Sequence, residues 1–257
     1  MSKNNDLIQT EQRDNVLLIT LNRPSAKNAF DKATAEAMEA AMDLLDRDDE
    51  LFAGIITGAN GTFCSGADLK AAARGERIGT KNRGGFGIFA KPSRKPLIAA
   101  VEGFAIAGGF ELCLSCDIII AAEDAKFGLP EVRHGLVAIG GGLFRLPKRL
   151  PYHLAMELSL TAELRGSEFF HQYGIVNHVV EPGKALEHAI TFCQKMLVNG
   201  PTALVATKEI IASSCEWTEE EAWKNQMGIA LKAFKSEDRN EGLKAFAEKR
   251  KPVWKGR

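Results

Sequence analysis

The stretch EGFAIAGGFELCLSCDIIIAA, residues 102–122, places one carboxylate, Glu111, deep inside a nearly continuous apolar run. The glycine pair Gly108–Gly109 precedes a short helix-like segment, and the β-branched run IIIAA follows it. This order predicts a strand that ends at the glycines, a buried helix and a second buried strand. An ionised carboxylate loses several kcal/mol of hydration free energy when it is buried unpaired, so Glu111 requires an explanation.

The same alternation of strand and helix patterns extends on both sides of this stretch. Short connections between the elements predict an α/β core with parallel strand pairs and right-handed crossovers. Strands are expected at 15–24, 53–58, 95–103 and 118–124, and helices at 31–50 and from Ala67 to Arg74.

Helical patterns dominate after residue 150, where 174–180 is the clearest strand signal. The break NGP at 199–201 predicts the boundary between two regions. We therefore expect an α/β core over 1–198 and a helical C-terminal region over 199–257.

Composition excludes several classes of partner. The 257 residues include 33 Lys plus Arg and 33 Asp plus Glu, so no global charge favours nucleic acid or an anionic membrane. Residues 73–96 hold seven basic side chains and one acidic one, a local patch that either meets phosphates or is simply solvated. No secretory signal, membrane-spanning segment or disulfide framework is recognisable, which predicts a cytoplasmic location.

Common cofactor motifs are absent. The runs AIGGGLF and RGGFG match neither a dinucleotide-binding fingerprint nor a P-loop. Cys113 and Cys116 form a lone C-x-x-C, a weak metal signal that equally describes two small buried residues. The five histidines form no metal motif, and Ser65 lacks a nucleophile elbow, so no metal is expected.

Two turns that lead into helices, CSGADL and AGGFEL, are more informative. The first N–H groups of a helix have no intrahelical partner, and two that converge on one point form an oxyanion hole. Glu111 follows Gly108 by about one turn, and Glu131 lies in the loop GLPEV. Two carboxylates there would suit proton transfer next to a carbonyl. Alternatively, Glu111 is a helix-start acid stabilised by ~0.3–1 kcal/mol, and Glu131 an exposed loop acid.

Four segments together resemble the enoyl-CoA hydratase/isomerase, or crotonase, superfamily. The resemblance implies a crotonase-like fold of repeated ββα units that form a spiral, with a helical C-terminal trimerisation region. It also implies self-association to a trimer or a dimer of trimers. The segments are LITLNRPSAKNAF (18–30), GIITGANGTFCSGADLK (54–70), the run from Lys95 to Val132, and EGLKAFAEKRKPVWKGR (241–257).

The resemblance also implies a reaction and its residues. The backbone N–H groups of Ala67 and Gly108 would form the oxyanion hole, Glu111 would activate water, and Glu131 would protonate the α-carbon. Because both acids are present, hydration or dehydration of a 2-enoyl-CoA is favoured, with no cofactor beyond the CoA thioester. The CoA contacts implied are Ala26, Lys27, Asn28, Ser65, Gly66, Asp68 and Leu69, with Phe246 and Lys249 from a neighbouring subunit.

One loop departs from the usual hydratase pattern. Residues 135–146 read GLVAIGGGLFRL where a Pro- and Gly-rich loop ending in Thr-Gln-Arg-Leu is typical. The loop lines the acyl end of the pocket in the family, and the sequence most resembles the carnitinyl-CoA (crotonobetainyl-CoA) dehydratase branch. A Δ3,Δ2-enoyl-CoA isomerase and a non-catalytic CoA-binding member remain alternatives. His134 either reaches the acyl pocket or is structural.

Overall fold

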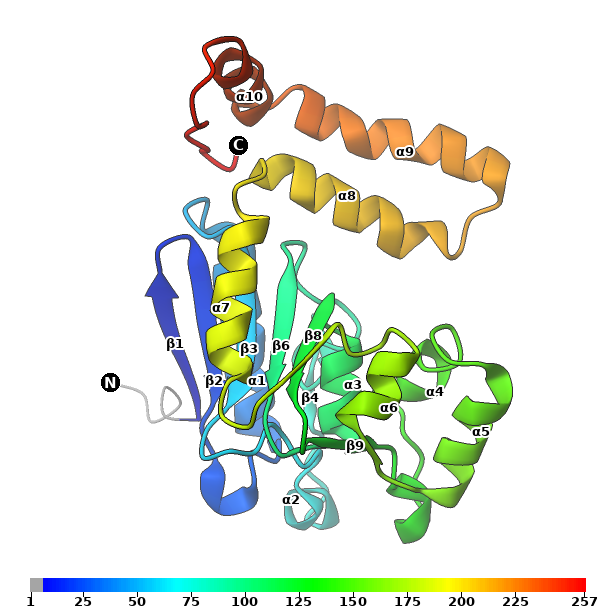
Figure 1. The fold of residues 1–257 in the computed structure, drawn as a ribbon. Coiled ribbons are helices and arrows are strands. Elements are labelled where there is room, and N and C mark those ends of the chain that lie inside the picture. Colours follow the sequence, from blue (N-terminus) through cyan, green and yellow to red (C-terminus); the bar gives the residue numbers. More distant parts are fainter. Residues whose placement is uncertain (1–6) are drawn as a thin grey trace.

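The computed structural model describes residues 7–257 and contains a six-stranded main sheet (Figure 1). Residues 1–6, which contributed to the expectation that no secretory signal is present, lie outside the described residues. The strand order is β1-β2-β3-β6-β8-β11, in which only β1 and β2 pair antiparallel. The strands are β1 (Ile8–Arg13), β2 (Val16–Leu21), β3 (Ala53–Gly58), β6 (Leu97–Val101), β8 (Ile118–Ala122) and β11 (His178–Val180).

Helices cover both faces of this sheet, as the apolar strands require. On one face, α1 (Lys32–Arg47) and α3 (Gly108–Leu114) pack against alternate residues of the strands. On the other, α7 (Ala185–Met196) presents Ala185, Ala189 and Cys193 to the sheet. Figure 1 shows α7 across the near face. The α/β core with parallel pairs is thus confirmed.

A second, three-stranded sheet gives the fold its repeating unit. It has the order β10-β9-β7, formed by β7 (Phe104–Ile106), β9 (Lys126–Gly128) and β10 (Arg165–Gly166). The strand pair β6–β7 is followed by α3, and Cys64 bridges to Ala105 after β3 in the same way. The expected repeat of two strands and a helix is therefore present.

Short helices and two 3-10 turns lie in the connections between the strands. The 3-10 turns are η2 (Pro24–Ala26), which follows β2, and η3 (Glu131–His134), which follows β9. The others are α2 (Leu69–Ala73), α4 (Gly142–Arg145), α5 (Tyr152–Thr161) and α6 (Ser167–Gln172).

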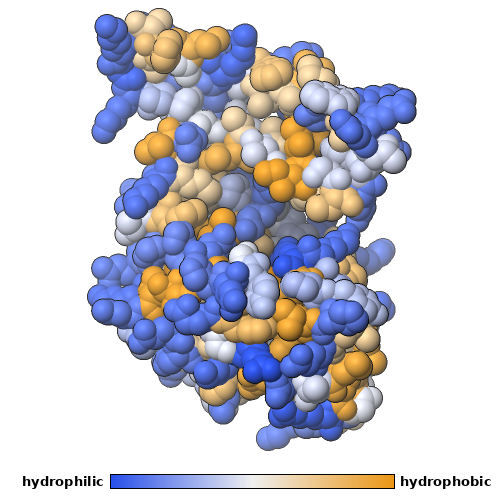
Figure 2. All heavy atoms as spheres, turned by 45° about the vertical axis from the view of Figure 1, so that its right-hand side comes forward, coloured by the Kyte–Doolittle hydropathy of each residue, from blue (hydrophilic) through white to orange (hydrophobic). Residues whose placement is uncertain are grey.

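Three C-terminal helices form an arm that projects from the core (Figure 1). They are α8 (Pro201–Ser214), α9 (Glu219–Phe234) and α10 (Glu237–Ala247). Ser236 separates α9 from α10 and caps α10 by accepting a hydrogen bond from the Arg239 N–H. Figure 2 shows hydrophobic side chains exposed on both the arm and the core, separated by a hollow. In the described part of the chain no helix is long and apolar enough to cross a membrane.

The basic segment 73–96 is less solvated than a loop of that composition suggests. It includes the two-residue strands β4 (Gly79–Thr80) and β5 (Gly84–Gly85). Arg83 is 3% exposed and pairs with Asp43 and Asp46 on α1. Lys95 is also buried and donates to the Asp48 carbonyl at the end of α1. These charges therefore hold the segment against α1, which restricts any phosphate patch to the remaining basic residues.

Candidate active site

The glycine pair before α3 is required by close backbone packing. A Cβ on Gly109 would overlap the Cys64 carbonyl, and a Cβ on Gly108 would lie 2.5 Å from Phe86 Cζ. Ala107, which precedes them, adopts φ 53° and ψ −130°, an unfavourable conformation for a non-glycine residue. The turn is thus pressed tightly against its neighbours, and the Gly108 N–H is presented at the start of the helix.

The loop that follows β3 lies beside this turn. The Cys64 N–H donates to the Phe104 carbonyl at 2.8 Å, and the Ile106 N–H donates back to Cys64 at 3.1 Å. A Cβ on Gly66 would lie 3.2 Å from the Gly108 nitrogen. Among residues 7–257, no hydrogen-bond partner is present for the amide of Ala67 or of Gly108. Two free N–H groups on adjacent backbone segments are what an oxyanion hole requires.

Glu111 is a buried acid with dedicated partners, and not a surface acid at a helix start. Its side chain is 3% exposed, and Oε1 accepts a 2.8 Å hydrogen bond from the Gly142 N–H. Burial raises the pKa of the carboxyl, while hydrogen bonds from the amides of Gly142 and Gly140 and the charge of Arg145 oppose that rise. These contacts therefore offset part of the effect of burial on the Glu111 carboxyl.

The run Gly140–Gly142 makes these contacts possible, and we call it the glycine loop. A Cβ on Gly140 would overlap Glu111 Oε2, and one on Gly142 would lie 3.1 Å from Oε1. Gly141 has φ 105°, which side chains rarely tolerate. The glycines that we discounted as a nucleotide motif are thus the contact surface of Glu111.

Glu131 occupies a different environment at the start of η3. It is half-buried, and its Oε2 atom is buried without a hydrogen-bond partner in the described part of the chain. Burial raises the pKa of Glu131 to about 7, the charge of Glu111 adds to the rise, and its own backbone N–H opposes it. In many enzymes, two carboxyls in different surroundings have different pKa values, and one then acts as the acid and the other as the base.

Three stacked phenylalanines, Phe30, Phe86 and Phe89, form an apolar wall beside Gly108 and the glycine loop. Ring centroids are 4.2 Å apart between Phe30 and Phe86 and 4.7 Å apart between Phe86 and Phe89. Phe86 contacts Gly108, and Phe89 abuts Gly140, so this wall reaches from the free amide to the glycine loop. Sequence analysis missed it, although the motif GGFG was a signal.

The segment 26–28 lies beside Ser65. The Ser65 N–H donates to the Lys27 carbonyl at 3.1 Å, and its hydroxyl donates to Ala26 at 3.3 Å. Lys27 and Asn28 both have positive φ, 49° and 57°. The Asn28 amide is buried and donates to the carbonyls of Ala59 and Thr62, whereas Lys27 is exposed.

Asp68 is also occupied within the chain. It caps α2 by accepting from the amides of Lys70 and Ala71, and it pairs with Arg23 at 2.9 Å. The Arg23 guanidinium lowers the pKa of Asp68. Asp68 therefore shapes the loop, while its neighbour Leu69 is 49% exposed.

Phe246 and Lys249 lie far from these residues. Phe246 is 86% exposed on α10, at the opposite end of the molecule from α2 (Figure 1). One chain does not bring them to the site, so any contact with its ligand needs a second copy.

Other candidate groups lie outside this chemistry. Cys113 is buried on α3 and Cys116 just after its end, and burial raises the pKa of Cys116 to about 12, so both thiols pack as apolar groups. His134 is exposed at the end of η3. Within residues 7–257 no group of three or more His, Cys, Asp or Glu side chains could hold a metal ion.

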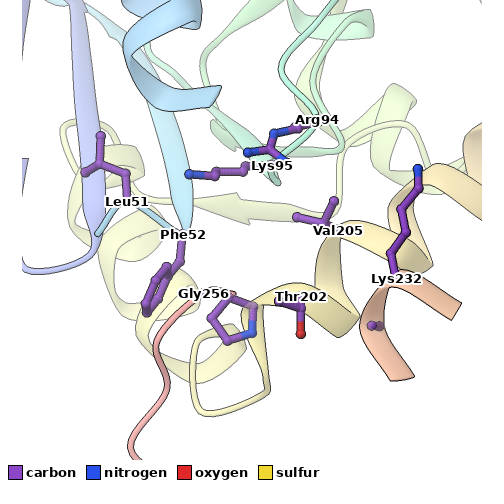
Figure 3. Close-up of a pocket in the computed structure, with 10 residues that line it drawn as sticks. Leu51, Phe52, Arg94, Lys95, Thr202, Val205, Lys232 and Gly256 are labelled. Atoms are coloured by element: carbon purple, nitrogen blue, oxygen red, sulfur yellow. The ribbon is translucent and has the colours of Figure 1, made fainter. Parts of the chain in front are cut away.

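A cavity of about 120 Å³ lies elsewhere, at the base of the arm (Figure 3). Its lining includes Phe52, Arg94, Lys95, Val205 and Lys232, from the core and the arm. Arg94 donates to the Asp46 carbonyl, and Lys95 to that of Asp48, so both cations serve the C-terminal end of α1. The cavity is separate from the two acids.

The fold and site together define an α/β protein in which a buried and a half-buried carboxylate accompany two free backbone amides. The chain belongs to the enoyl-CoA hydratase/isomerase family, whose model matches residues 11–257. The expected superfamily and fold are therefore confirmed.

Similar proteins cover nearly the whole chain. Enoyl-CoA hydratase EchA19 of Mycobacterium tuberculosis is 40% identical over 258 residues, 96% of each chain. The carnitinyl-CoA dehydratase of Salmonella typhi is 44% identical over 251 residues, 94% of this chain and 95% of its own. The crystal structure of enoyl-CoA hydratase EchA1 from Mycobacterium marinum superposes with a TM-score of 0.95 at 52% identity, covering 98% of this chain and 100% of the other.

Proposed function

We propose that this protein is an enoyl-CoA hydratase, which adds water reversibly across the 2,3 double bond of a 2-enoyl-CoA. The observation that carries the proposal is the pairing of Glu111, whose carboxylate accepts a hydrogen bond from the Gly142 N–H, with Glu131, whose pKa is raised to about 7. One acid is suited to accept a proton from water and the other to donate one.

In this mechanism the amides of Ala67 and Gly108 donate to the thioester oxygen and stabilise the enolate-like charge that develops there. Glu111 orients the water and accepts its proton as oxygen attacks the β-carbon. Glu131 delivers a proton to the α-carbon, and dehydration follows the reverse course. After the product forms, Glu111 releases its proton to water and Glu131 takes one up from water, which returns both carboxyls to their starting states. The proposed reaction therefore uses no cofactor beyond the CoA thioester.

The CoA moiety would lie along the backbone of 26–28 and 65–69, which are adjacent. We infer that Phe246 and Lys249 contact CoA bound to a neighbouring subunit, because α10 is remote from the site of its own chain. Self-association to a trimer or a dimer of trimers would place them there, with the helical region 199–257 as the contact region. We place the enzyme in the cytoplasm.

A second candidate substrate is crotonobetainyl-CoA, with carnitinyl-CoA as its hydrated form. It is favoured by the 44% identity to a protein named carnitinyl-CoA dehydratase. An isomerase that moves a Δ3 double bond to Δ2 would need only one base, so the presence of two shielded acids favours hydration.

The deciding experiment is a hydration assay on a panel of crotonyl-, long-chain, branched, aromatic and crotonobetainyl-CoA. Hydration removes the ultraviolet absorbance of the conjugated thioester and incorporates ¹⁸O from labelled water into the product. Turnover of a 3-enoyl-CoA without ¹⁸O incorporation would identify an isomerase instead. Tight binding of CoA with no turnover of any member would refute the hydratase proposal.

A further inference from the structure

Arg145, the last residue of α4, joins three segments that surround Glu111. One guanidinium nitrogen, Nη1, donates to Ser115 Oγ at 3.0 Å and to the Gly140 carbonyl at 3.1 Å. The other, Nη2, donates to the Phe89 carbonyl at 2.6 Å. Ser115 is the C-cap of the helix that carries Glu111, and its hydroxyl donates to the Glu111 carbonyl at 2.8 Å.

These bonds connect the helix that carries Glu111, the glycine loop and the phenylalanine wall. The three carbonyl and hydroxyl acceptors lie in different directions, and a planar guanidinium with five donors can serve all of them at once. A lysine ammonium supplies one compact charge with a different geometry. The position of Gly140, which contacts Glu111, therefore depends on the hydrogen bonds that the Arg145 guanidinium donates.

We propose that Arg145 is a positioning residue for hydration: it holds the glycine loop against Glu111 and keeps that carboxylate ready to accept a proton from water. The inference rests on the proposed function of the site, but it assigns a role to a residue that does not itself contact the reacting atoms.

The charges around Glu111 allow this role to be tested. Arg145 is the cation that favours the ionised form of Glu111. The Glu131 carboxyl, at the start of η3, interacts electrostatically with Glu111. Burial and the positive charge of Arg149, on the following turn, lower the pKa of Arg145. Without the Arg145 charge, Glu111 would be left with two amide hydrogen bonds against burial and a neighbouring acid, so its proton would be held more tightly.

The test compares Arg145→Gln and Arg145→Lys by the pH dependence of kcat/KM for whichever enoyl-CoA the wild type hydrates best. For Arg145→Gln we expect kcat to fall roughly 10–100-fold, because small misplacement of a base is costly. We also expect the acidic limb to move up by roughly one pH unit, the shift typical of losing a nearby opposite charge. Arg145→Lys should restore the position of the acidic limb but only part of kcat.

Arg83→Gln is the matched control, since Arg83 is an equally bonded arginine of the same core that pairs with α1. It should lower Tm and leave the acidic limb in place. An acidic limb that stays in place in Arg145→Gln, or that moves equally in Arg83→Gln, would overturn the positioning role while leaving the hydratase intact. A wild-type protein without hydration activity would refute the proposed function instead.

Discussion

The Gly142 amide donates a 2.8 Å hydrogen bond to Glu111 Oε1 across 31 residues of sequence. The bond exists because Gly142 has no side chain to separate the loop from the carboxylate. A buried carboxylate thus obtains hydrogen-bond donors without a direct ion pair. Burial raises the pKa of Glu111, which makes the carboxylate more basic, while the Gly142 amide opposes part of that rise.

Gly140→Ala should therefore damage activity more than stability. The new methyl group would overlap Glu111 Oε2 and the Phe89 ring, so the carboxylate must move out of its position. We expect kcat to fall by about 100-fold, the cost of displacing a catalytic group by roughly 1 Å. Steady-state kinetics and thermal unfolding of the variant measure the two effects.

Gly228→Ala is the control for this change. Gly228 lies inside α9 with open space around its Cβ position, so alanine should raise stability by roughly 0.5–1 kcal/mol and leave kcat unchanged. Equal kcat values for the two variants would show that the glycine loop does not position Glu111.

Removing either carboxyl should abolish proton transfer and spare CoA binding. Glu111→Gln keeps the size of the side chain but cannot accept a proton, and Glu131→Gln cannot donate one. General acid–base catalysis typically contributes roughly 10²–10⁴-fold each, so kcat should drop by that factor in either variant. Rapid kinetics gives kcat, and calorimetry with a non-reactive acyl-CoA gives Kd. Substantial hydration by either variant would contradict the assigned roles.

The sequence predicted the parts of this site that depend on local pattern. Alternating apolar strands and helices gave the parallel sheet, and the glycines before Glu111 indicated a tight turn into a helix. It did not predict β1, whose residues after Ile8 are exposed and show no apolar alternation. Strand β9 was also missed, because three residues are too few to establish a period of two.

Contacts between segments that are far apart in the chain could not be predicted from the sequence alone. Nothing local indicates that Gly140 meets Glu111, that Phe86 reaches Gly108, or that Arg145 bonds to Phe89. Arg83 and Lys95 were grouped with a solvated basic loop, but α1 supplies the acids and carbonyls that bury them. Such pairings are decided by tertiary packing, which composition and periodicity do not encode.

The C-terminal tail should stabilise the arm through Asp238, a buried acid. Its carboxylate accepts from the amides of Lys255 at 2.7 Å and Gly256 at 3.2 Å, and more weakly from Thr202. Asp238→Asn keeps the shape but loses the charge, and hydrogen bonds to charged groups contribute about 1.5–3 kcal/mol each. We expect a drop of about 2 kcal/mol in the free energy of unfolding and faster proteolysis after residue 250. Asp124→Asn, at an exposed turn, should change neither.

Glu131 should make stability depend on pH in the direction opposite to that of an ion-paired acid. Its folded pKa of about 7 exceeds the ordinary 4.5, so the folded state holds the proton more tightly than the unfolded state. Stability from this group is then fully present below pH 4.5 and is lost as the pH rises through 7. Glu131→Gln cannot ionise, so it should be more stable than the wild type at pH 8.5, by about 1–2 kcal/mol after allowing for partial exposure, with a smaller gap at pH 5.5. Urea unfolding at the two pH values measures the gap. A constant or inverted gap would show that the acid is solvated, whereas the expected gain, in a variant without activity, would identify Glu131 as a group retained for chemistry at a cost in stability.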